Sequence, residues 1–493
     1  MRITRRQFLA GTAIAAGSLA ISTSARHVLG ANDEIRVAIV GVGGQGSSHL
    51  GSYIGKDKNF DIKALNVRLV AVCDADKDHV DKAVAAAGQQ GFKAVGVQDP
   101  RKILEMKDVD AIVTATPNHW HSLMSIWAVQ NGKDIYVEKP LSHDMNEGRK
   151  VVEAAAKYKK IVYVGTQNRS DEGRRAAYEW IWAGNIGKIV RGRAFCYKPR
   201  PTIGKTSGEQ PIPAGVDYDL WCGPAPKDPL RRKKLHYDWH WFWATANGDI
   251  GNQGIHEMDK CRWGIRATQV KRAMGMGGRF GYDDDAETPN TEIAFIETDT
   301  VPIIFEVRGL PMHKASETEK APPMDAYKGI RIGEIIECEG GYYDGGWVYD
   351  AKGEKVKQFL RDGGGKHRAN FIKALRSRKA EDNMAPPIEG HRSALCFHAG
   401  NLSYRVGKEM SQADVTDMFK TDKVGQECWE RFQKHVSINE SDAAKWKATV
   451  GPWLTFDPEA EKFTGTFADQ ANKYLKGPRD GKYREPFVVP DQV

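Results

Sequence analysis

A lysine at the end of a short apolar segment could carry acid–base chemistry. The segment Ile135–Val137 has the composition of a buried strand, and Glu138, Lys139 and Pro140 follow it directly. Burial and nearby positive charge lower the pKa of a lysine, so that its amine can hold a hydroxyl group and share the proton. A charged pair fixed by a proline at a strand end therefore predicts a reactive site rather than a surface turn.

A glycine motif near the start of the chain predicts a nucleotide site. The segment GVGGQG places Gly41, Gly43 and Gly46 in Gly-x-Gly-x-x-Gly spacing between a predicted strand and a predicted helix. The first glycine allows a tight turn, the second lets the backbone approach a pyrophosphate, and the third permits close helix packing. Gly44 and Gln45 open the helix, whose unpaired N–H groups bind phosphate.

An aspartate at the end of the next strand indicates which dinucleotide binds. Asp74 ends the apolar segment VRLVAVCD. Its carboxylate can accept hydrogen bonds from both ribose hydroxyls of adenosine and would repel a 2′-phosphate, so NAD is expected rather than NADP. The insertion 51–64 explains why Asp74 lies further from the glycines than the usual ~20 residues.

Polar residues follow a third predicted strand, 111–115. Thr116, Pro117, Asn118 and His121 come directly after it. Ligands of open parallel sheets bind outside the carboxyl ends of the strands, where Lys139 is also expected. We therefore predict that these residues line one cofactor crevice, and that Glu138 orients the lysine or the nicotinamide.

The elements that must position these residues alternate regularly. Continuous apolar strands are expected at 35–40, 67–73, 111–115, 135–137 and 161–164, with helical periodicity between them at 79–87, 122–131 and 146–158. This pattern predicts a doubly wound parallel sheet covered on both faces, the Rossmann architecture. From about residue 185 the pattern changes to long β-rich segments, which predict a second α/β domain with an open, mostly antiparallel sheet.

The expected domains follow from these changes in pattern. Residues 1–31 carry Arg5-Arg6, a short weakly apolar run and small residues, which predicts a Tat-type signal peptide and export to the periplasm or beyond. The remaining chain is expected to form a Rossmann domain at 32–168, a substrate and oligomerisation domain at 169–408, and an extension at 409–493 that wraps the second domain.

Composition excludes several other classes of protein. Half of the formal net charge of +8 comes from arginines before residue 27, so the mature chain is too mildly basic to indicate a nucleic-acid partner. No later segment is long enough to span a membrane. The seven cysteines are widely spaced and odd in number, which argues against a disulfide framework or a zinc site. To bind a metal, His236, His240 and His256 would need a carboxylate partner and a defined geometry, and no His-Glu-x-x-His motif or other compact spacing occurs, so no metal is expected.

Taken in order, these motifs resemble the Gfo/Idh/MocA family of glucose–fructose oxidoreductase and inositol dehydrogenase. The matching segments are GVGGQG, CDAD, TPNHWH, EKPL, GTQNRS (165–170), GDIGNQGIHEMD (248–259) and EGHRSALCFHAGNLSYRVG (389–407). The resemblance implies a sugar or polyol bound between two domains, a homodimer or homotetramer, and a lysine, here Lys139, beside the nicotinamide and the substrate hydroxyl. The Lys-Pro peptide is commonly cis in that family.

The resemblance also implies a proton acceptor in the second domain. His256 matches the family's histidine, and imidazole titrates near pH ~6.5. The family usually has an aspartate four residues earlier, where this chain has Asn252, which can bind a hydroxyl but cannot accept a proton. Asp259, one turn later, is predicted to orient His256 or contact substrate. Gln167 and Arg169 are predicted to line the cofactor and substrate cleft.

Three functions remain open from the sequence. The first is an NAD(P)-dependent oxidoreductase that transfers hydride between a carbohydrate and a tightly bound nicotinamide. The second is an NAD-dependent glycosidase or lyase that works through transient oxidation at C3, which the loss of the family's aspartate at Asn252 favours. The third is a non-catalytic sugar sensor, which the intact glycines, Lys139 and His256 argue against.

Overall fold

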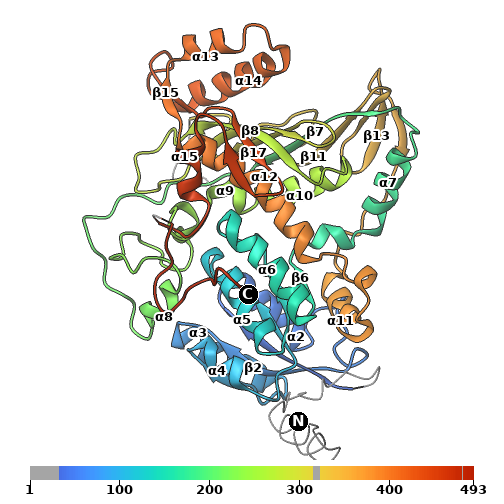
Figure 1. Ribbon diagram of the computed structural model, residues 1–493, viewed down its shortest axis with the longest axis vertical. Coiled ribbons are helices and arrows are strands. Elements are labelled where there is room, and N and C mark those ends of the chain that lie inside the picture. The colour runs from blue at the N-terminus through green and yellow to red at the C-terminus, as the bar shows by residue number, and fades with distance from the viewer. Residues whose placement is uncertain (1–32, 315–321, 480) are drawn as a thin grey trace, which may run out of the picture.

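The computed structural model describes residues 33–314, 322–479 and 481–493. The predicted signal peptide, 1–31, lies outside the described residues. Two sheets organise the chain (Figure 1): a parallel sheet in the lower part of the view and a larger sheet above it. This confirms the predicted fold class.

The first sheet consists of six parallel strands in the order β3-β2-β1-β4-β5-β6. They are β1 (Ile35–Val40), β2 (Val67–Cys73), β3 (Val95–Val97), β4 (Ala111–Thr114), β5 (Asp134–Val137) and β6 (Val162–Val164). The order reverses between β1 and β4, so a crevice opens there at the carboxyl ends of the strands. Most side chains of β1, β2, β4 and β5 are buried, as their continuous apolar sequences predict.

Helices cover both faces of this sheet and begin at identifiable caps. They are α2 (Gly44–Tyr53), α3 (Lys77–Gln89), α4 (Pro100–Glu105), α5 (Asn118–Gln130) and α6 (Met145–Tyr158). Asp76, Asp99 and Asp144 accept backbone hydrogen bonds at the starts of α3, α4 and α6. The starts of α2 and α5 are different, because Gly43 and Pro117 provide no side-chain cap.

The second sheet has twelve strands among the described residues, with a main order of β14-β13-β12-β11-β7-β10-β9-β8-β16-β15. Only β7 and β10 pair in parallel in this sheet. The strands are β7 (Ile189–Tyr197), β8 (Val270–Gly278), β9 (Thr291–Thr298), β10 (Ile303–Arg308), β11 (Ile332–Cys338), β12 (Gly341–Tyr343), β13 (Trp347–Asp350), β14 (Lys355–Gln358), β15 (Lys408–Met410), β16 (Ala448–Val450), β17 (Leu454–Asp457) and β18 (Lys462–Thr464). β17 joins through β8, and β18 through β17.

Helices pack on the two faces of the second sheet. One face packs against α10 (Gly254–Gly264) and α12 (Pro387–Arg405), and the opposite face against α14 (Lys423–Asn439). Adjacent strand residues show this alternation, since Phe305 packs with the first group and Ile304 with the second. The remaining helices are η1 (Gln167–Ser170), α7 (Glu172–Trp182), α8 (Tyr218–Cys222), η2 (Asp238–Trp241), α9 (Gly248–Gly251), α11 (His367–Ser377), η3 (Ala380–Asp382), α13 (Gln412–Met418), α15 (Ala468–Ala471) and η4 (Asn472–Tyr474).

The C-terminal segment contacts both parts of the molecule. Residues 408–464 add strands and helices to the second sheet, and the chain then returns to the parallel sheet (Figure 1). Tyr483, Phe487 and Val489 are buried in the core of the first domain. The tail therefore links the two sheets in addition to covering the second.

Several strands were not expected from the sequence, and β3 and β8 show why. β3 is a short, largely exposed strand, and β8 contains several glycines, so neither shows a continuous apolar pattern. Both are held by neighbouring strands, β3 by β2 and β8 by β9. Across the described parts of the chain, no helix is both long enough and apolar enough to cross a bilayer.

Candidate active site

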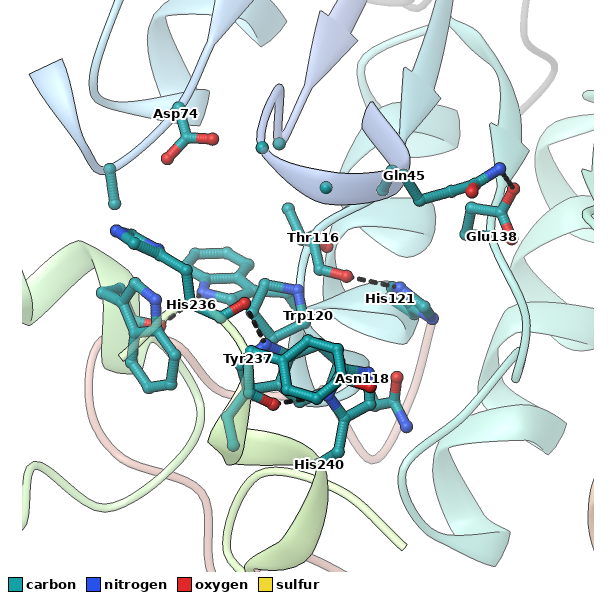
Figure 2. A pocket seen from close by; sticks show the side chains of 18 of the residues that line it. Gln45, Asp74, Thr116, Asn118, Trp120, His121, Glu138, His236, Tyr237 and His240 are labelled. Atoms are coloured by element: carbon teal, nitrogen blue, oxygen red, sulfur yellow. Dashed lines mark hydrogen bonds between the residues drawn. The ribbon is translucent and has the colours of Figure 1, made fainter. Parts of the chain in front are cut away.

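A cavity of about 370 Å³ lies where the carboxyl ends of β1, β2, β4 and β5 face the second domain. Figure 2 shows Asp74 toward one end and Glu138 toward the other, with the glycine loop between them and Tyr237 and His240 on the facing wall. The predicted residues that line it are Gly41, Gly43, Gly44, Gln45, Asp74, Thr116, Pro117, Asn118, His121, Glu138, Lys139 and Asn252. The tertiary structure thus joins residues from the two domains in one cavity.

The glycine loop has the geometry that a pyrophosphate needs. Gly41 has φ +80°, and a Cβ there would lie 2.7 Å from the backbone nitrogen of Thr116. A Cβ on Gly46 would lie 1.7 Å from the carbonyl oxygen of Gly41. Because no side chain caps α2, its first N–H groups remain free for an anion.

Asp74 is held by the backbone around it. One carboxylate oxygen accepts a hydrogen bond from the Val42 N–H at 2.9 Å, and the other accepts from the Asp76 N–H at 3.0 Å. A carboxylate offers about four lone-pair sites, so capacity remains for ribose hydroxyls. Asp74 therefore fits the role predicted for it.

Glu138 is oriented by the first domain and not by the lysine side chain. It accepts hydrogen bonds from His49 at 2.9 Å and Gln45 at 3.3 Å. Burial alone would raise the pKa of Glu138, but the hydrogen bond and charge of His49 and the charge of Lys139 hold it below its usual range. Glu138 is thus a fixed anion beside the cavity.

Lys139 reaches across to the second domain. Its ammonium donates to the Asn252 carbonyl at 3.3 Å, and the Lys139–Pro140 peptide is cis. Burial lowers the pKa of Lys139, the charge of Glu138 opposes this, and the charge of Arg200 adds to the lowering. No carboxylate oxygen among the described residues lies within 4.0 Å of this ammonium. The amine is therefore available to a substrate hydroxyl.

His121 connects two of the strand ends that form the cavity. Its Nδ1 lies 2.6 Å from the Pro140 carbonyl oxygen, and its Nε2 lies 2.8 Å from that of Thr116 (Figure 2). Burial lowers the pKa of His121. The ring therefore holds the loops after β4 and β5 in place.

Two neutral imidazoles flank Lys139. His256 stands on α10, and burial followed by the charge of Lys139 lowers its pKa to about 3. His240 lines the cavity, and burial followed by the charge of Lys139 lowers its pKa to about 4. His240 Nδ1 lies 2.6 Å from the Tyr237 carbonyl oxygen, which favours a lone pair on Nε2. Both rings are therefore neutral at pH 7, and each keeps one nitrogen lone pair.

Five predicted site residues lie outside the cavity lining, namely Gly46, Gln167, Arg169, His256 and Asp259. Arg169 makes a bidentate ion pair with Asp259, with contacts of 2.8–3.0 Å, and it also contacts Glu389 at 3.1 Å. Asp259 additionally accepts a hydrogen bond from Ser393 at 2.7 Å, and its carboxylate is buried. Gln167 begins η1 next to this network. The structure joins Arg169 and Asp259 to each other and not to the cavity.

Several cavity residues were missed in the sequence. Lys198 and Arg200 follow β7, and Arg200 is paired with buried Asp249 at 2.5 and 2.9 Å. Tyr237 and Trp239 come from the aromatic segment 236–249. Two signals were available, the aromatic residues of 236–249, whose faces suit a sugar ring, and the Lys-Pro-Arg sequence directly after a long strand. Neither loop has a periodicity that predicts which way its side chains point.

The chain matches two family models that together cover about half of it. Residues 35–166 match the NAD-binding Rossmann fold of the Gfo/Idh/MocA oxidoreductase family, and residues 188–305 match its C-terminal alpha/beta domain. The chain is also 34% identical to inositol 2-dehydrogenase 4 of Saccharopolyspora erythraea over 158 residues, 32% of this chain and 44% of that protein. It is 31% identical to the scyllo-inositol 2-dehydrogenase (NAD(+)) of Bacillus subtilis over 38% of this chain and 53% of that protein.

These matches span about half the length of the curated relatives. A glycosyl hydrolase family 109 protein of Shewanella pealeana is 26% identical over 33% of this chain and 35% of that protein. Among solved structures, the WlbA dehydrogenase of Chromobacterium violaceum, in complex with NADH and UDP-GlcNAcA, has a similar fold. Its TM-score is 0.55 at 20% identity, over 77% of this chain and 96% of that one. By its two matched domains, the chain belongs to the Gfo/Idh/MocA family of NAD-binding oxidoreductases.

Proposed function

We propose that the protein is an NAD-dependent oxidoreductase that acts on a CH–OH group of a sugar or polyol. The observation that carries this proposal is the single cavity that joins the glycine loop and Asp74 to Lys139 and the second domain. A dinucleotide site and a proton-handling amine in one cavity are the two parts that alcohol oxidation requires.

The residues present fit NAD. The uncapped start of α2 and Gly43 suit the pyrophosphate, and Asp74 suits the adenosine ribose. Thr116, Pro117, Asn118 and Glu138 line the remainder of the cavity toward Lys139. When bound, NAD supplies the hydride acceptor for the carbon that bears the hydroxyl.

The chain's own groups handle the proton. Lys139 holds the hydroxyl oxygen, and its lowered pKa favours transfer through the amine. The neutral ring of His256 does not line the cavity but is close enough for the charge of Lys139 to lower its pKa, so it is assigned to receive the proton through Lys139. The His240 ring contacts the substrate from the facing wall. Asn252 donates to or accepts from a neighbouring hydroxyl but does not change protonation.

Substrate binding is assigned to the second-domain wall. Lys198, Tyr237 and Trp239 line it with Asn252. Aromatic faces suit the C–H faces of a sugar ring, and polar side chains between them suit its hydroxyls. This wall supports a carbohydrate substrate, in keeping with the names of the inositol dehydrogenase relatives.

The test is to purify the mature chain, measure bound nicotinamide by mass spectrometry, and follow nicotinamide absorbance with a panel of polyols, aldoses and aryl glycosides. Reduction or oxidation of the nicotinamide by a polyol or aldose is expected. If no nicotinamide binds, the proposal fails. If it binds and no sugar changes its redox state or is itself converted, the sugar-sensor interpretation replaces it.

A second candidate is an NAD-dependent glycosidase or lyase that works through transient C3 oxidation. Similarity to a glycosyl hydrolase family 109 protein and Asn252 in place of the family's aspartate favour it. In this reaction the neutral ring of His256 removes the C2 proton. Release of an aryl group without net change in the nicotinamide distinguishes this candidate from the dehydrogenase.

We also propose export by the Tat route and assembly into a homodimer or homotetramer. The twin arginine Arg5-Arg6 supports export. Replacing both by lysine should retain the protein in the cytoplasm, as measured by fractionation. Light scattering of the purified protein tests the assembly state, and a monomer at all concentrations contradicts it.

A further inference from the structure

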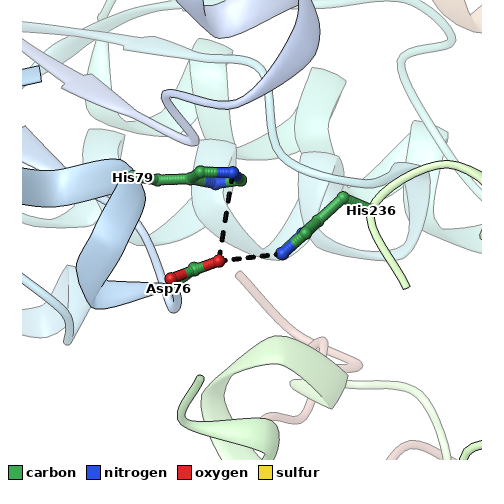
Figure 3. Close-up of side chains that lie close together, drawn as sticks. All are labelled: Asp76, His79 and His236. Carbon is green, nitrogen blue, oxygen red and sulfur yellow. Dashed lines mark hydrogen bonds and ion pairs between the residues drawn. The ribbon is translucent and has the colours of Figure 1, made fainter. Parts of the chain in front are cut away.

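Three potential metal ligands meet at the end of the cavity near Asp74. They are Asp76, His79 and His236, and their ligand atoms all lie within 4.8 Å of one another (Figure 3). Asp76 and His79 belong to the first domain, at the start of α3. His236 comes from the second-domain segment before η2. The spacing in sequence hides this group, since 157 or more residues separate His236 from the other two.

The ligand distances fit a small divalent cation. Asp76 Oδ2 lies 2.9 Å from His236 Nε2 and 3.9 Å from His79 Nε2. Zinc bonds of about 2.0–2.1 Å in a tetrahedral site place neighbouring ligand atoms about 3.3 Å apart. These two distances lie on both sides of that value, and all three ligand atoms lie within 4.8 Å of one another, so rotation of the side chains could bring them to a common metal ion.

Two of the three ligands, Asp76 and His79, are oriented by separate contacts. Asp76 uses Oδ1 to accept the Asp78 N–H at 2.9 Å, which leaves Oδ2 directed at the two rings. His79 Nδ1 lies 3.4 Å from Asp74 Oδ2, and this buried nitrogen has no other hydrogen-bond partner. A carboxylate beside one ring nitrogen directs the lone pair to the other, as in carboxylate–histidine–zinc sites.

The charge of the group also calls for a cation. Within the described residues, the ion-pair partners of Asp74 and Asp76 are the imidazoles of His79 and His236, with no lysine or arginine among them. Backbone N–H groups stabilise the two carboxylates, but their side-chain partners are imidazoles alone, so a bound cation would add the charge that no lysine or arginine supplies. A metal would leave both rings neutral.

The backbone around the group already joins the two domains. The Lys77 N–H donates to the Gly215 carbonyl at 3.1 Å, and the Asp217 N–H donates to the Ala75 carbonyl at 2.9 Å. The ligands therefore meet without a further change in the chain.

We propose that Asp76, His79 and His236 form a zinc site that ties the second-domain segment to the first domain across the adenosine end of the cavity. Three protein ligands leave a fourth position for water or a cofactor hydroxyl. The metal would hold the wall closed and slow the release of the dinucleotide. This last consequence rests on the proposed function, whereas the metal site does not.

The test uses calorimetric titration of zinc into the full mature chain after dialysis against a chelator. One zinc per chain is expected, and His236→Ala should weaken binding by more than about 100-fold, since loss of an outer-shell partner alone costs about 10–100-fold. Asp78→Asn is the matched control, because Asp78 is an exposed acid on the same helix turn and should leave affinity unchanged. No stoichiometric zinc, or equal binding by His236→Ala, would overturn the site.

A second variant separates loss of a ligand from loss of folding. His236→Cys keeps a zinc ligand, so it should retain binding, and with cobalt it should give a thiolate charge-transfer band that the parent lacks. Absence of this band in a folded variant argues against coordination.

A chelator should also speed NAD release from the parent and not from His236→Ala. An unchanged release rate would overturn the proposed role of the metal in retaining the cofactor. If no nicotinamide binds at all, the proposed function fails, but the zinc titration still tests the metal site independently.

Discussion

The reactivity assigned to Lys139 depends on its surroundings at the scale of single residues. Its amine contacts a carbonyl oxygen, the nearby anion Glu138 is engaged by His49, and Arg200 adds positive charge. A lysine in this setting loses its proton more easily than an exposed one. On a solvated turn the same lysine would keep its ordinary pKa and stay protonated at neutral pH.

Replacing Lys139 by alanine should lower kcat by about 10²–10⁴-fold, because a positioned proton-transfer group contributes that much. NAD affinity should change little, since the cofactor contacts proposed for Asp74 and the glycine loop remain. Steady-state kinetics and a cofactor titration measure the two quantities.

His256→Asn should also lower kcat, whereas His240→Asn should mainly raise KM. The reverse pattern would assign the proton acceptor to His240.

Glu292 should make the protein less stable as pH rises. It is buried on β9 and one carboxylate oxygen has no partner, so desolvation raises its pKa from 4.5 to about 8. The unfolded chain loses this proton near pH 4.5 and the folded chain only near 8. The contribution of Glu292 to stability is therefore full below about pH 4.5, falls between these values, and levels off above them. The shift corresponds to roughly 5 kcal/mol.

Glu292→Gln should remove most of this slope and raise the free energy of unfolding at pH 8, as measured by denaturant titration from pH 5 to 8. Glu297→Gln, on the same strand but half-exposed and paired with Arg272, is the control and should change the slope little. Identical slopes for the parent and Glu292→Gln would contradict the assigned pKa.

At the scale of elements, two helices position groups of the site. The start of α2 provides N–H groups for the cofactor, and α10 carries His256 and Asp259. The α2 helix begins at an uncapped glycine packed directly on the strand end, so its N–H groups face the cavity. On α10, His256 and Asp259 lie on one face, as predicted, but Asp259 is a turn deeper, where η1 provides Arg169. Helical periodicity gives the face of a residue but not the neighbour at each depth.

Gly46→Ala should weaken NAD binding and destabilise the first domain. A Cβ there would press on the Gly41 carbonyl, and overpacking of this kind costs about 1–3 kcal/mol. Gly51→Ala on the same helix has open space around its Cβ and should bind NAD normally. Equal affinities in calorimetry would show that the loop can shift without loss.

Asp259→Asn should act on stability rather than on substrate binding. It would leave Arg169 with a weakened partner in a buried network, and breaking a buried ion pair costs about 3–5 kcal/mol. Thermal unfolding should therefore shift downward while KM of the folded enzyme stays nearly constant. A large rise in KM with unchanged Tm would instead support the contact between Asp259 and the substrate that the sequence predicted.

At the scale of the whole molecule, the C-terminal tail joins the domains that form the cavity. Phe487 packs on Trp120 of α5, with ring centroids 5.4 Å apart, and the Tyr483 hydroxyl donates to Asp144 at 2.9 Å. Arg484 forms an ion pair with Asp219 of the second domain at 2.8 Å. The tail therefore contacts both walls of the cavity at once.

Phe487→Ala should destabilise the protein by about 3–5 kcal/mol, because a large buried ring leaves a cavity when it is removed. Gln492→Ala, which is exposed five residues later, should have no measurable effect. Thermal unfolding of both variants measures the difference. Parent-like stability of Phe487→Ala would show that the tail packs only weakly.

The sequence by itself determined the parallel sheet, the glycine loop, Asp74 and Lys139, because strand patterns and strand-end residues are local properties of the chain. It did not determine the facing wall with Lys198, Tyr237 and His240, or the partner of Asp259. The meeting of Asp76, His79 and His236 was likewise decided only by the tertiary structure. Irregular loops and long-range contacts leave no periodic signal, since their geometry is set by whatever packs against them.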